Sequence, residues 1–202
     1  MYAVTGLKQL PDSDRGSARP GGINNFGQVV GWASFTFPRG TLNQAFLWSE
    51  GVIRALGFLR HRDHSEAHAI NDRGLVVGWS GGSPFDLHAF LWNELTGMEE
   101  LGTLPDRQLS EAHAINNSGE VVGGSFNLVA VPFFGQEERG KHAFIWREST
   151  GMEDLNVLLP PNSGWELIGA QDINDSGQIL CEGFHTGPDN ARERRLCVLT
   201  PS

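Results

Sequence analysis

The chain has 202 residues and a formal charge of −9 at pH 7. A chain of that length can bury a hydrophobic core. Its net negative charge provides no basic surface for the phosphate backbone of a nucleic acid. No apolar run approaches the roughly 20 residues of a membrane helix, and residues 1–4 lack the profile of a signal peptide. The sequence therefore predicts one domain over residues 1–202, with no nucleic-acid or membrane partner, in the cytoplasm.

The first predicted element is a short strand over residues 4–10. It contains a Leu-x-x-Leu motif that recurs at residues 56–59, 101–104 and 155–158. Short apolar segments of this kind, bounded by Gly, Pro, Asn or Asp, are typical of strands. No segment of the chain sustains the 3.6-residue period of an amphipathic helix.

The second predicted element is a hairpin, and the rest of the chain is organised around its motif, Ala-Ile-Asn-x-x-Gly-x-Val-Val. The motif is clearest at residues 67–78, and related copies lie at residues 23–31, 115–123 and 173–181. Asn and Gly at this spacing indicate a tight turn in which Gly takes a left-handed conformation and the Asn side chain bonds local backbone. Each copy therefore predicts two strands joined by a tight turn.

A third motif, Ala-Phe-Leu-Trp, follows each hairpin. Its copies lie at residues 44–48, 88–92 and 142–146, and a degraded copy lies at residues 195–199. A short connection ending at Gly51, Gly97 or Gly151 then leads to the next Leu-x-x-Leu strand. Such short connections join antiparallel neighbours, so each unit predicts a four-stranded sheet.

Four such units cover residues 2–50, 51–96, 97–150 and 151–202. A ring of such sheets is a β-propeller, so we predict an all-β, four-bladed propeller. The chain begins with a fourth-type strand and ends with a third-type strand, so the N-terminal strand would complete the last blade and close the ring. The alternative is half of a larger ring completed by a second copy, although a monomer is favoured.

The three motifs in this order resemble the bacterial HAF repeat family, named after the tripeptide found here at residues 88–90 and 142–144. The resemblance covers most of the chain. It implies a repeat fold of the propeller kind, and no activity, because family members are mostly described as extracellular repeat proteins without an assigned function. The missing export signal departs from that description and favours the cytoplasm for this chain.

The long predicted connections all emerge on one face, where a rigid scaffold usually carries function. Those within units cover residues 35–43, 81–87, 126–141 and 184–194. The apolar stretch over residues 126–134 predicts a ligand or partner surface, or alternatively a lid over the channel mouth. The aromatic residues predicted to bind a small organic molecule or a partner protein are Phe35, Phe37, Phe85, Phe126, Phe133, Phe134, Trp165 and Phe184.

Polar side chains are predicted near the axis. His68 and His113 occupy equivalent positions in the innermost strands, and Gln171 occupies the same position in the fourth unit. Repeated polar residues of this kind tie strands together, although imidazoles near an axis could also hold a metal or an anion. We predict the structural role, with no metal and no cofactor. Cys181 and Cys197 are predicted to be free thiols rather than a disulfide framework, with pairing across neighbouring strands as the alternative.

Catalytic residues should lie where the repeat is broken, and the fourth unit breaks it most. Asp172 and Glu182 replace an alanine and a tryptophan of other copies, and His185 follows closely. These three side chains could form an acid–base centre at the channel mouth. Alternatively, the two carboxylates serve ring closure by pairing with Arg192, Arg194 or Arg195. The leading prediction is a non-enzymatic binding module on the long-loop face, and the alternative is a small enzyme.

Overall fold

The computed structural model describes residues 3–4, 6–7, 18–37, 40–83, 86–131, 135–187 and 189–201. This part of the chain forms 15 strands and one short 3-10 helix, and the strands make four antiparallel sheets. The all-β prediction is confirmed, and the described residues form four sheets. None of the described segments is a helix with the length and apolarity needed to cross a membrane.

The strands follow the chain order within every sheet. The first sheet contains β1 (Ala18–Ile23), β2 (Val29–Phe37), β3 (Gly40–Ser49) and β4 (Val52–Ala55). The second contains β5 (His64–Ile70), β6 (Val76–Ser83), β7 (Asp86–Asn93) and β8 (Gly97–Gly102). The third contains β9 (Leu109–Ile115), β10 (Val121–Val131), β11 (Gly135–Arg147) and β12 (Gly151–Asp154), followed by the helix η1 (Leu155–Leu158). The fourth contains β13 (Trp165–Ile173), β14 (Ile179–Thr186) and β15 (Arg192–Leu199).

The tight turn between the first two strands of each sheet has the predicted chemistry. In the second sheet, Asn71 Oδ1 accepts hydrogen bonds from the backbone N–H groups of Arg73 and Leu75, both at 3.0 Å. Gly74 has a φ of +76°, a conformation that costs an L-residue free energy. The same Asn and Gly pattern recurs in the other three turns. The motif therefore encodes the hairpins.

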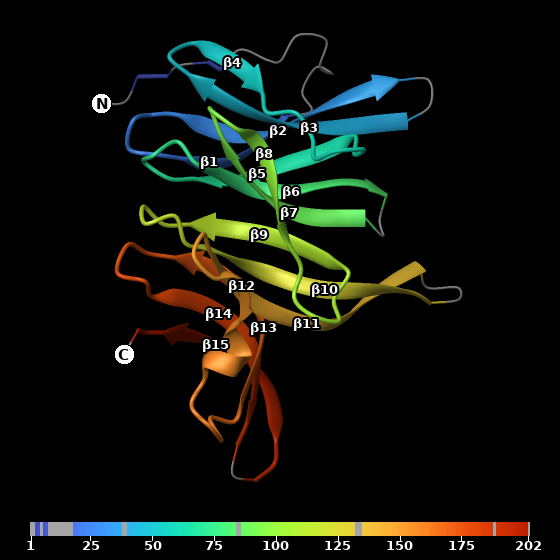
Figure 1. Ribbon diagram of the computed structural model, residues 1–202, viewed down its shortest axis with the longest axis vertical. Helices are drawn as coiled ribbons and strands as arrows, with labels where there is room; N and C mark the ends of the chain where they lie inside the picture. The colour runs from blue at the N-terminus through green and yellow to red at the C-terminus, as the bar shows by residue number, and fades with distance from the viewer. Residues whose placement is uncertain are drawn as a thin grey trace.

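The sheets are arranged in a row along the long axis of the molecule (Figure 1). The first strand of each later sheet packs across three strands of the sheet before it: β5 across β1 to β3, β9 across β5 to β7, and β13 across β9 to β11. The two ends of the chain consequently lie toward opposite ends of the row (Figure 1). The second and third sheets each bury one face against the sheet before and the other against the sheet after, whereas the first and fourth sheets each have one described neighbour.

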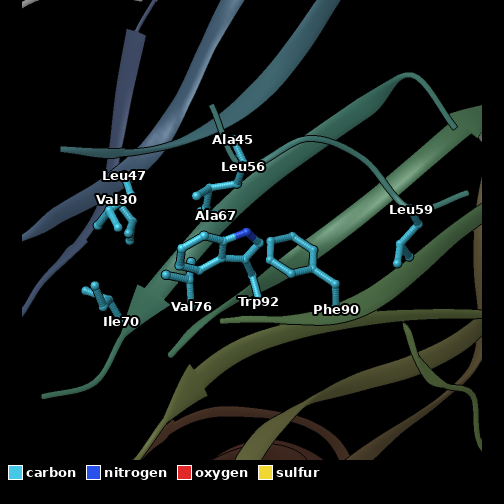
Figure 2. Close-up of a cluster of buried hydrophobic side chains, with 10 residues drawn as sticks. All are labelled: Val30, Ala45, Leu47, Leu56, Leu59, Ala67, Ile70, Val76, Phe90 and Trp92. Carbon is cyan, nitrogen blue, oxygen red and sulfur yellow. The ribbon is translucent and has the colours of Figure 1, made fainter. Parts of the chain in front are cut away.

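Apolar clusters fill the space between successive sheets. Figure 2 shows the first, in which Val30 and Leu47 of the first sheet lie near Ile70, Val76 and Trp92 of the second. Two comparable clusters join the second sheet to the third and the third to the fourth. At about 25 cal/mol per Å² of apolar surface, this burial is the main favourable term in sheet stacking.

A ladder of side-chain amides and carboxylates also joins the tight turns of successive sheets. Nδ2 of Asn24 donates to the carbonyl oxygen of Asn71 at 3.0 Å, and Nδ2 of Asn71 donates to that of Asn116 at 2.9 Å. Asn116 repeats the contact toward Asn174 at 3.3 Å. Because each turn bonds the next one, the ladder sets the spacing of the four sheets.

Ring closure is not seen among the described residues and stays a prediction. The fourth sheet has three strands, and the residues described at the N-terminus, 3–4 and 6–7, belong to no strand. The remainder of the expected first strand, residues 8–10, lies outside the described residues. Within the described part of the chain, the arrangement is thus a row of four sheets.

The four long loops predicted within units were wrong, because most of their residues form strands. β10 and β11 extend to Val131 and Gly135, and β2 and β3 pair as far as Phe37 opposite Gly40. Continued pairing satisfies backbone N–H and C=O groups that a loop would leave to solvent. The lack of a repeated motif in these segments predicts loops. Cross-strand hydrogen bonding between backbone groups does not require a repeated sequence, so strands form there nonetheless.

Candidate functional site

Those aromatic side chains of the predicted surface that the structure describes do not gather into one pocket. Phe126 is only 2% exposed and lies under the ammonium group of Lys141, whose Nζ is 5.1 Å from the ring centroid. Its assignment to an exposed ligand surface was therefore wrong: residue 126 sits within β10, on the side that packs into the protein. Phe35 packs with Trp48 and Ile53 in a separate apolar cluster of the first sheet.

The aromatic residues of the fourth sheet lie apart from those of the first. Trp165 and His185 stack with their ring centroids 5.0 Å apart, and the guanidinium of Arg192 covers Phe184 at 4.0 Å. Phe184 also lines a shallow cavity of about 320 Å³ with Lys141 and Glu182. The side chain of Phe37 and all of Phe85, Phe133 and Phe134 lie outside the described residues.

The residues proposed for acid–base catalysis are not brought together. Asp172 is opposite Leu180 in the β13–β14 ladder, whereas His185 is opposite Trp165 at the other end of these strands. His185 is five residue steps along β14 from Leu180, which corresponds to roughly 16 Å of strand. Glu182 instead bonds Arg194 at 2.7 Å, which agrees with the alternative that its charge is paired with an arginine.

The axial histidines tie neighbouring sheets together. His68 Nδ1 donates to the carbonyl oxygen of Ala112 at 2.9 Å, and His113 Nδ1 donates to that of Ala170 at 2.8 Å. Burial lowers the pKa of His68 below its usual value, which favours the neutral ring. Gln171, at the equivalent position in the fourth sheet, is exposed. Among the described residues, no group of three or more His, Cys, Asp or Glu side chains is arranged to hold a metal ion.

The two cysteines face each other across neighbouring strands as free thiols. Cys181 of β14 is directly opposite Cys197 of β15. Burial and the neighbouring Cys197 raise the pKa of Cys181 to about 12. The thiolate is the reactive form of cysteine, so Cys181 is an inert core side chain at neutral pH.

A groove of about 950 Å³ lies between the second and third sheets, on the side of the tight turns. Its floor is apolar, with Leu75, Leu91 and the partly buried Trp146. Its rim is charged and includes Glu99 and Glu148, which have no hydrogen-bonding or ionic partner among the described residues. The volume is in the range of sites that bind organic ligands or side chains.

The corresponding junction between the first and second sheets is closed by an arginine of the chain itself. The guanidinium carbon of Arg54 lies 5.1 Å from the ring centroid of Trp92, and Nη1 bonds Glu94 at 3.0 Å. Strand register makes Glu99 the equivalent of Arg54, because Arg54 pairs with Leu47 and Glu99 with Leu91. Trp146 and Glu148 thus repeat the tryptophan and the acceptor carboxylate at the second junction. Glu99 stands there in place of the cation.

Two arginines, Arg73 and Arg147, also line the groove, and among the described residues the guanidinium of Arg73 donates only to the carbonyl oxygen of Ser118 at 3.5 Å. Arg147 Nε donates to Glu120 at 2.7 Å, and Nη1 donates to Glu153 at 3.2 Å. Burial alone would raise the pKa of Glu120, but the hydrogen bonds from Arg147 and Asn116 outweigh it and hold the pKa below its usual value. Glu120 is therefore ionised and paired with Arg147, whereas Glu99, Glu148 and Arg73 form no ion pair among the described residues.

This groove was missed at the level of sequence, although the signal is present there. Aligning the Leu-x-x-Leu strands places Arg54, Glu99 and Glu153 at one position, and aligning the tryptophans places Glu94 and Glu148 at another. The change from Arg54 to Glu99 at the first position indicates a site only when the packing of one sheet on the next brings the two positions together.

Comparison with known proteins gives no assignment: no family model, no curated protein and no solved structure matches the chain.

Proposed function

We propose that this protein is a non-enzymatic binding module that holds an arginine side chain of a partner protein in the groove between its second and third sheets. The observation that carries this proposal is the internal comparison. Arg54 lies over Trp92 and bonds Glu94 at the first junction, whereas at the second junction no cation among the described residues lies over Trp146 or pairs with Glu148. The partner's guanidinium would take the place that Arg54 takes one sheet earlier.

The chemistry of the groove favours a guanidinium over a neutral ligand. A cation on the face of a tryptophan gains about 0.5–2 kcal/mol, the larger value applying when the site is desolvated. Glu99 and Glu148 would both accept from its planar array of donors, which lysine cannot match. A partner carboxylate or phosphate would meet two unpaired carboxylates and be repelled.

One arginine alone would bind weakly, so the partner should also present apolar side chains. Leu75 and Leu91 line the floor, and Leu95 stands at the rim with 95% of its surface exposed. An arginine flanked by leucine-like residues would bury this apolar surface, at about 25 cal/mol per Å². The predicted ligand class is therefore a basic and apolar peptide segment.

The fold supports this role in a general way, because rigid stacked sheets hold the rim residues at a constant spacing. We propose that the sheets are propeller blades, as the HAF repeat resemblance implies. The site proposed here differs from the long-loop surface expected from the sequence. The small-enzyme alternative, centred on Asp172, stays a prediction, and an unchanged rate in Asp172→Asn for any activity found would count against it.

The test is titration of the protein with the peptide acetyl-Gly-Leu-Arg-Leu-Gly-amide, followed by calorimetry and by the NMR signal of the Trp146 indole N–H. We expect one site with a Kd on the order of 1 mM or tighter. Replacing the peptide's arginine with citrulline keeps its shape but removes its charge. The citrulline peptide should bind at least about tenfold more weakly, which corresponds to about 1.4 kcal/mol.

Two reciprocal variants sharpen the test. Glu99→Arg supplies the chain's own cation to Trp146 and Glu148, so the peptide should lose its site. Arg54→Glu removes the cation that lies over Trp92 and bonds Glu94, so the number of peptides bound per chain should rise from one to two. The control is Glu137→Arg, the same charge change on the β10–β11 hairpin, which should leave binding unaltered. Equal binding of the arginine and citrulline peptides, or undiminished binding by Glu99→Arg, would refute the proposal.

A further inference from the structure

The two ends of the row of sheets are complementary to each other. In the first three sheets, three apolar positions face the next sheet and are buried or partly buried there. These positions are Val30, Ala45 and Leu47; Val77, Ala89 and Leu91; and Val122, Ala143 and Ile145. In the fourth sheet the same positions are Leu180, Leu196 and Val198, which are 39%, 70% and 59% exposed. The fourth sheet thus keeps an apolar forward face that no described residue covers.

Among the described residues, no other sheet packs on the opposite face of the first sheet, where Phe46 and Ala33 are buried in a cluster of their own but Ile23 is exposed. Ile70, Ile115 and Ile173 pack against the sheet before them and are at most 8% exposed. Their equivalent in the first sheet, Ile23, is 69% exposed. An isoleucine that packs at all three existing junctions is therefore available for a fourth.

The polar ladder ends in the same complementary way. At each junction a backbone N–H donates to the Oδ1 atom of the next turn: Asn25 to Asp72, Asp72 to Asn117, and Asn117 to Asp175, at 2.8–2.9 Å. Asp175 itself has no such acceptor among the described residues, and nothing described donates to Oδ1 of Asn25. One end of the ladder offers the donor that the other end lacks.

The order of residues along the ladder also suits continuation. Asn25, Asp72, Asn117 and Asp175 alternate between amide and carboxylate, so every carboxylate lies beside amides that donate to it. Joining Asp175 to Asn25 preserves this alternation, whereas two fourth sheets meeting face to face would bring Asp175 against Asp175. Like charges at that distance repel, so the ladder selects a head-to-tail contact.

We propose that a second copy of this chain docks its first sheet on the exposed face of the fourth sheet and thereby continues both the apolar packing and the ladder. Ile23 of the second copy then packs on Leu180 and Val198, and the N–H of Asp175 donates to Asn25. The contact is heterologous, so each copy uses both ends and a closed ring of copies results when the curvature allows. This contact involves neither Trp146 nor Glu148 and is independent of the peptide groove.

The experiment is sedimentation velocity and light scattering of the full chain over a range of concentrations. A mass of at least twice the 22.1 kDa of one chain is expected. Ile23→Glu and Leu196→Arg each alter a side chain that is about 70% exposed, so both variants should fold. Each should weaken association at least about tenfold, as expected when a charge enters an apolar contact. The control is Val157→Glu, which alters an equally exposed side chain on neither face.

Mixing the two variants distinguishes this contact from any symmetric one. In the mixture, the unaltered fourth sheet of Ile23→Glu can bind the unaltered first sheet of Leu196→Arg, which forms a normal junction. The other junction brings the introduced glutamate of one variant against the introduced arginine of the other. Assembly restored in the mixture supports the proposal. A wild-type monomer at all concentrations, or an assembly that neither variant weakens, overturns it.

Discussion

Glu66 and Glu111 show how two equivalent residues acquire opposite acid–base behaviour. Each stands two positions before an axial histidine in the first strand of its sheet. Burial raises the pKa of Glu66, and Glu111 adds to this effect despite a hydrogen bond from Asn43. Burial also acts on Glu111, but bonding to His113 and attraction to Lys141 outweigh it and lower the pKa. Glu111 is bonded to His113 and lies near Lys141, whereas Glu66 is bonded to the neutral amide of Asn43, and its burial outweighs the attraction to His64 and Arg19.

The pH dependence of stability should therefore have opposite signs at these two residues. Because the pKa of Glu66 is raised in the folded state, its protonated form stabilises the fold below pH 4.5, the ordinary pKa. This stabilisation is lost as the pH rises through the folded-state pKa. Glu66→Gln should then raise Tm at pH 7, by about 2 °C, and leave it nearly unaltered at pH 4.

The matched variant is Glu111→Gln. In the unaltered chain, the pKa of Glu111 is lowered, so its ionised form stabilises the fold above pH 4.5. This stabilisation is lost as the pH falls through the folded-state pKa. Glu111→Gln should accordingly lower Tm at pH 7, and the loss should shrink toward acid pH. Calorimetry of both variants at the two pH values checks the pair; shifts of the same sign at pH 7 would contradict the assignment.

Individual side chains were the hardest feature to predict from the sequence. Phe126 was expected at a surface because it begins an apolar stretch, yet it lies beneath Lys141, which is 15 residues away in the chain. Asp172 and His185 were grouped because both break the repeat, but strand register separates them. A repeat identifies equivalent positions; it does not say which non-equivalent residues meet.

At the level of elements, the tight turns carry both the hairpin and the junction between sheets. Asn71 is buried, and besides its two turn bonds it donates to Asn116 in the next sheet. Asn174 makes the same turn bonds, but its Nδ2 bonds only Gln178 within its own turn. Comparing variants of Asn71 and Asn174 therefore separates what the turn bonds and the ladder bonds each contribute to the free energy of unfolding.

Asn71→Ala should cost about 2–4 kcal/mol of unfolding free energy, because it leaves buried backbone donors and an acceptor without partners. Asn174→Ala should cost at least about 1 kcal/mol less in dilute protein, since its turn is exposed and has no following sheet. Urea denaturation measures both values. Equal losses would mean that the ladder contributes nothing beyond the turns.

The hairpin and its turn were predictable because they depend on local chemistry: an Asn side chain, a Gly with positive φ, and β-branched neighbours. The lengths of β10 and β11 were not, because pairing beyond the motif depends on backbone hydrogen bonding that any sequence can make. Four buried serines were also missed. The hydroxyl groups of these residues each accept a hydrogen bond from a backbone N–H and donate one to a backbone carbonyl oxygen; they are Ser65, Ser80, Ser110 and Ser125.

For the whole molecule, the division into four sheets followed from the repeat, but their arrangement in space did not. Whether four sheets form a closed ring or a row depends on the small rotation between neighbours, which is set by packing at every junction and has no local signature. Contacts here join each sheet to the next, with the first and fourth at opposite ends of the row (Figure 1).

A row and a closed ring differ in how stability is distributed. In a row, β6 and β10 lie in sheets with a neighbouring sheet on both faces, whereas β2 and β14 lie in sheets with a described neighbouring sheet on one face only. All four strands are hydrogen-bonded to neighbours on both sides, so local pairing is matched among them. Because terminal repeats gain only one interface, amides of β2 and β14 should exchange at least about tenfold faster than those of β6 and β10.

Hydrogen exchange of dilute protein, resolved at Val30, Val77, Val122 and Leu180, measures this gradient directly, since these four residues are equivalent positions in the second strands. Uniform protection in the dilute monomer would mean that the first and fourth sheets are in contact within one chain, as the closed ring requires. A gradient that disappears as the protein concentration rises would instead place the missing neighbour in a second copy, because only an intermolecular contact depends on concentration.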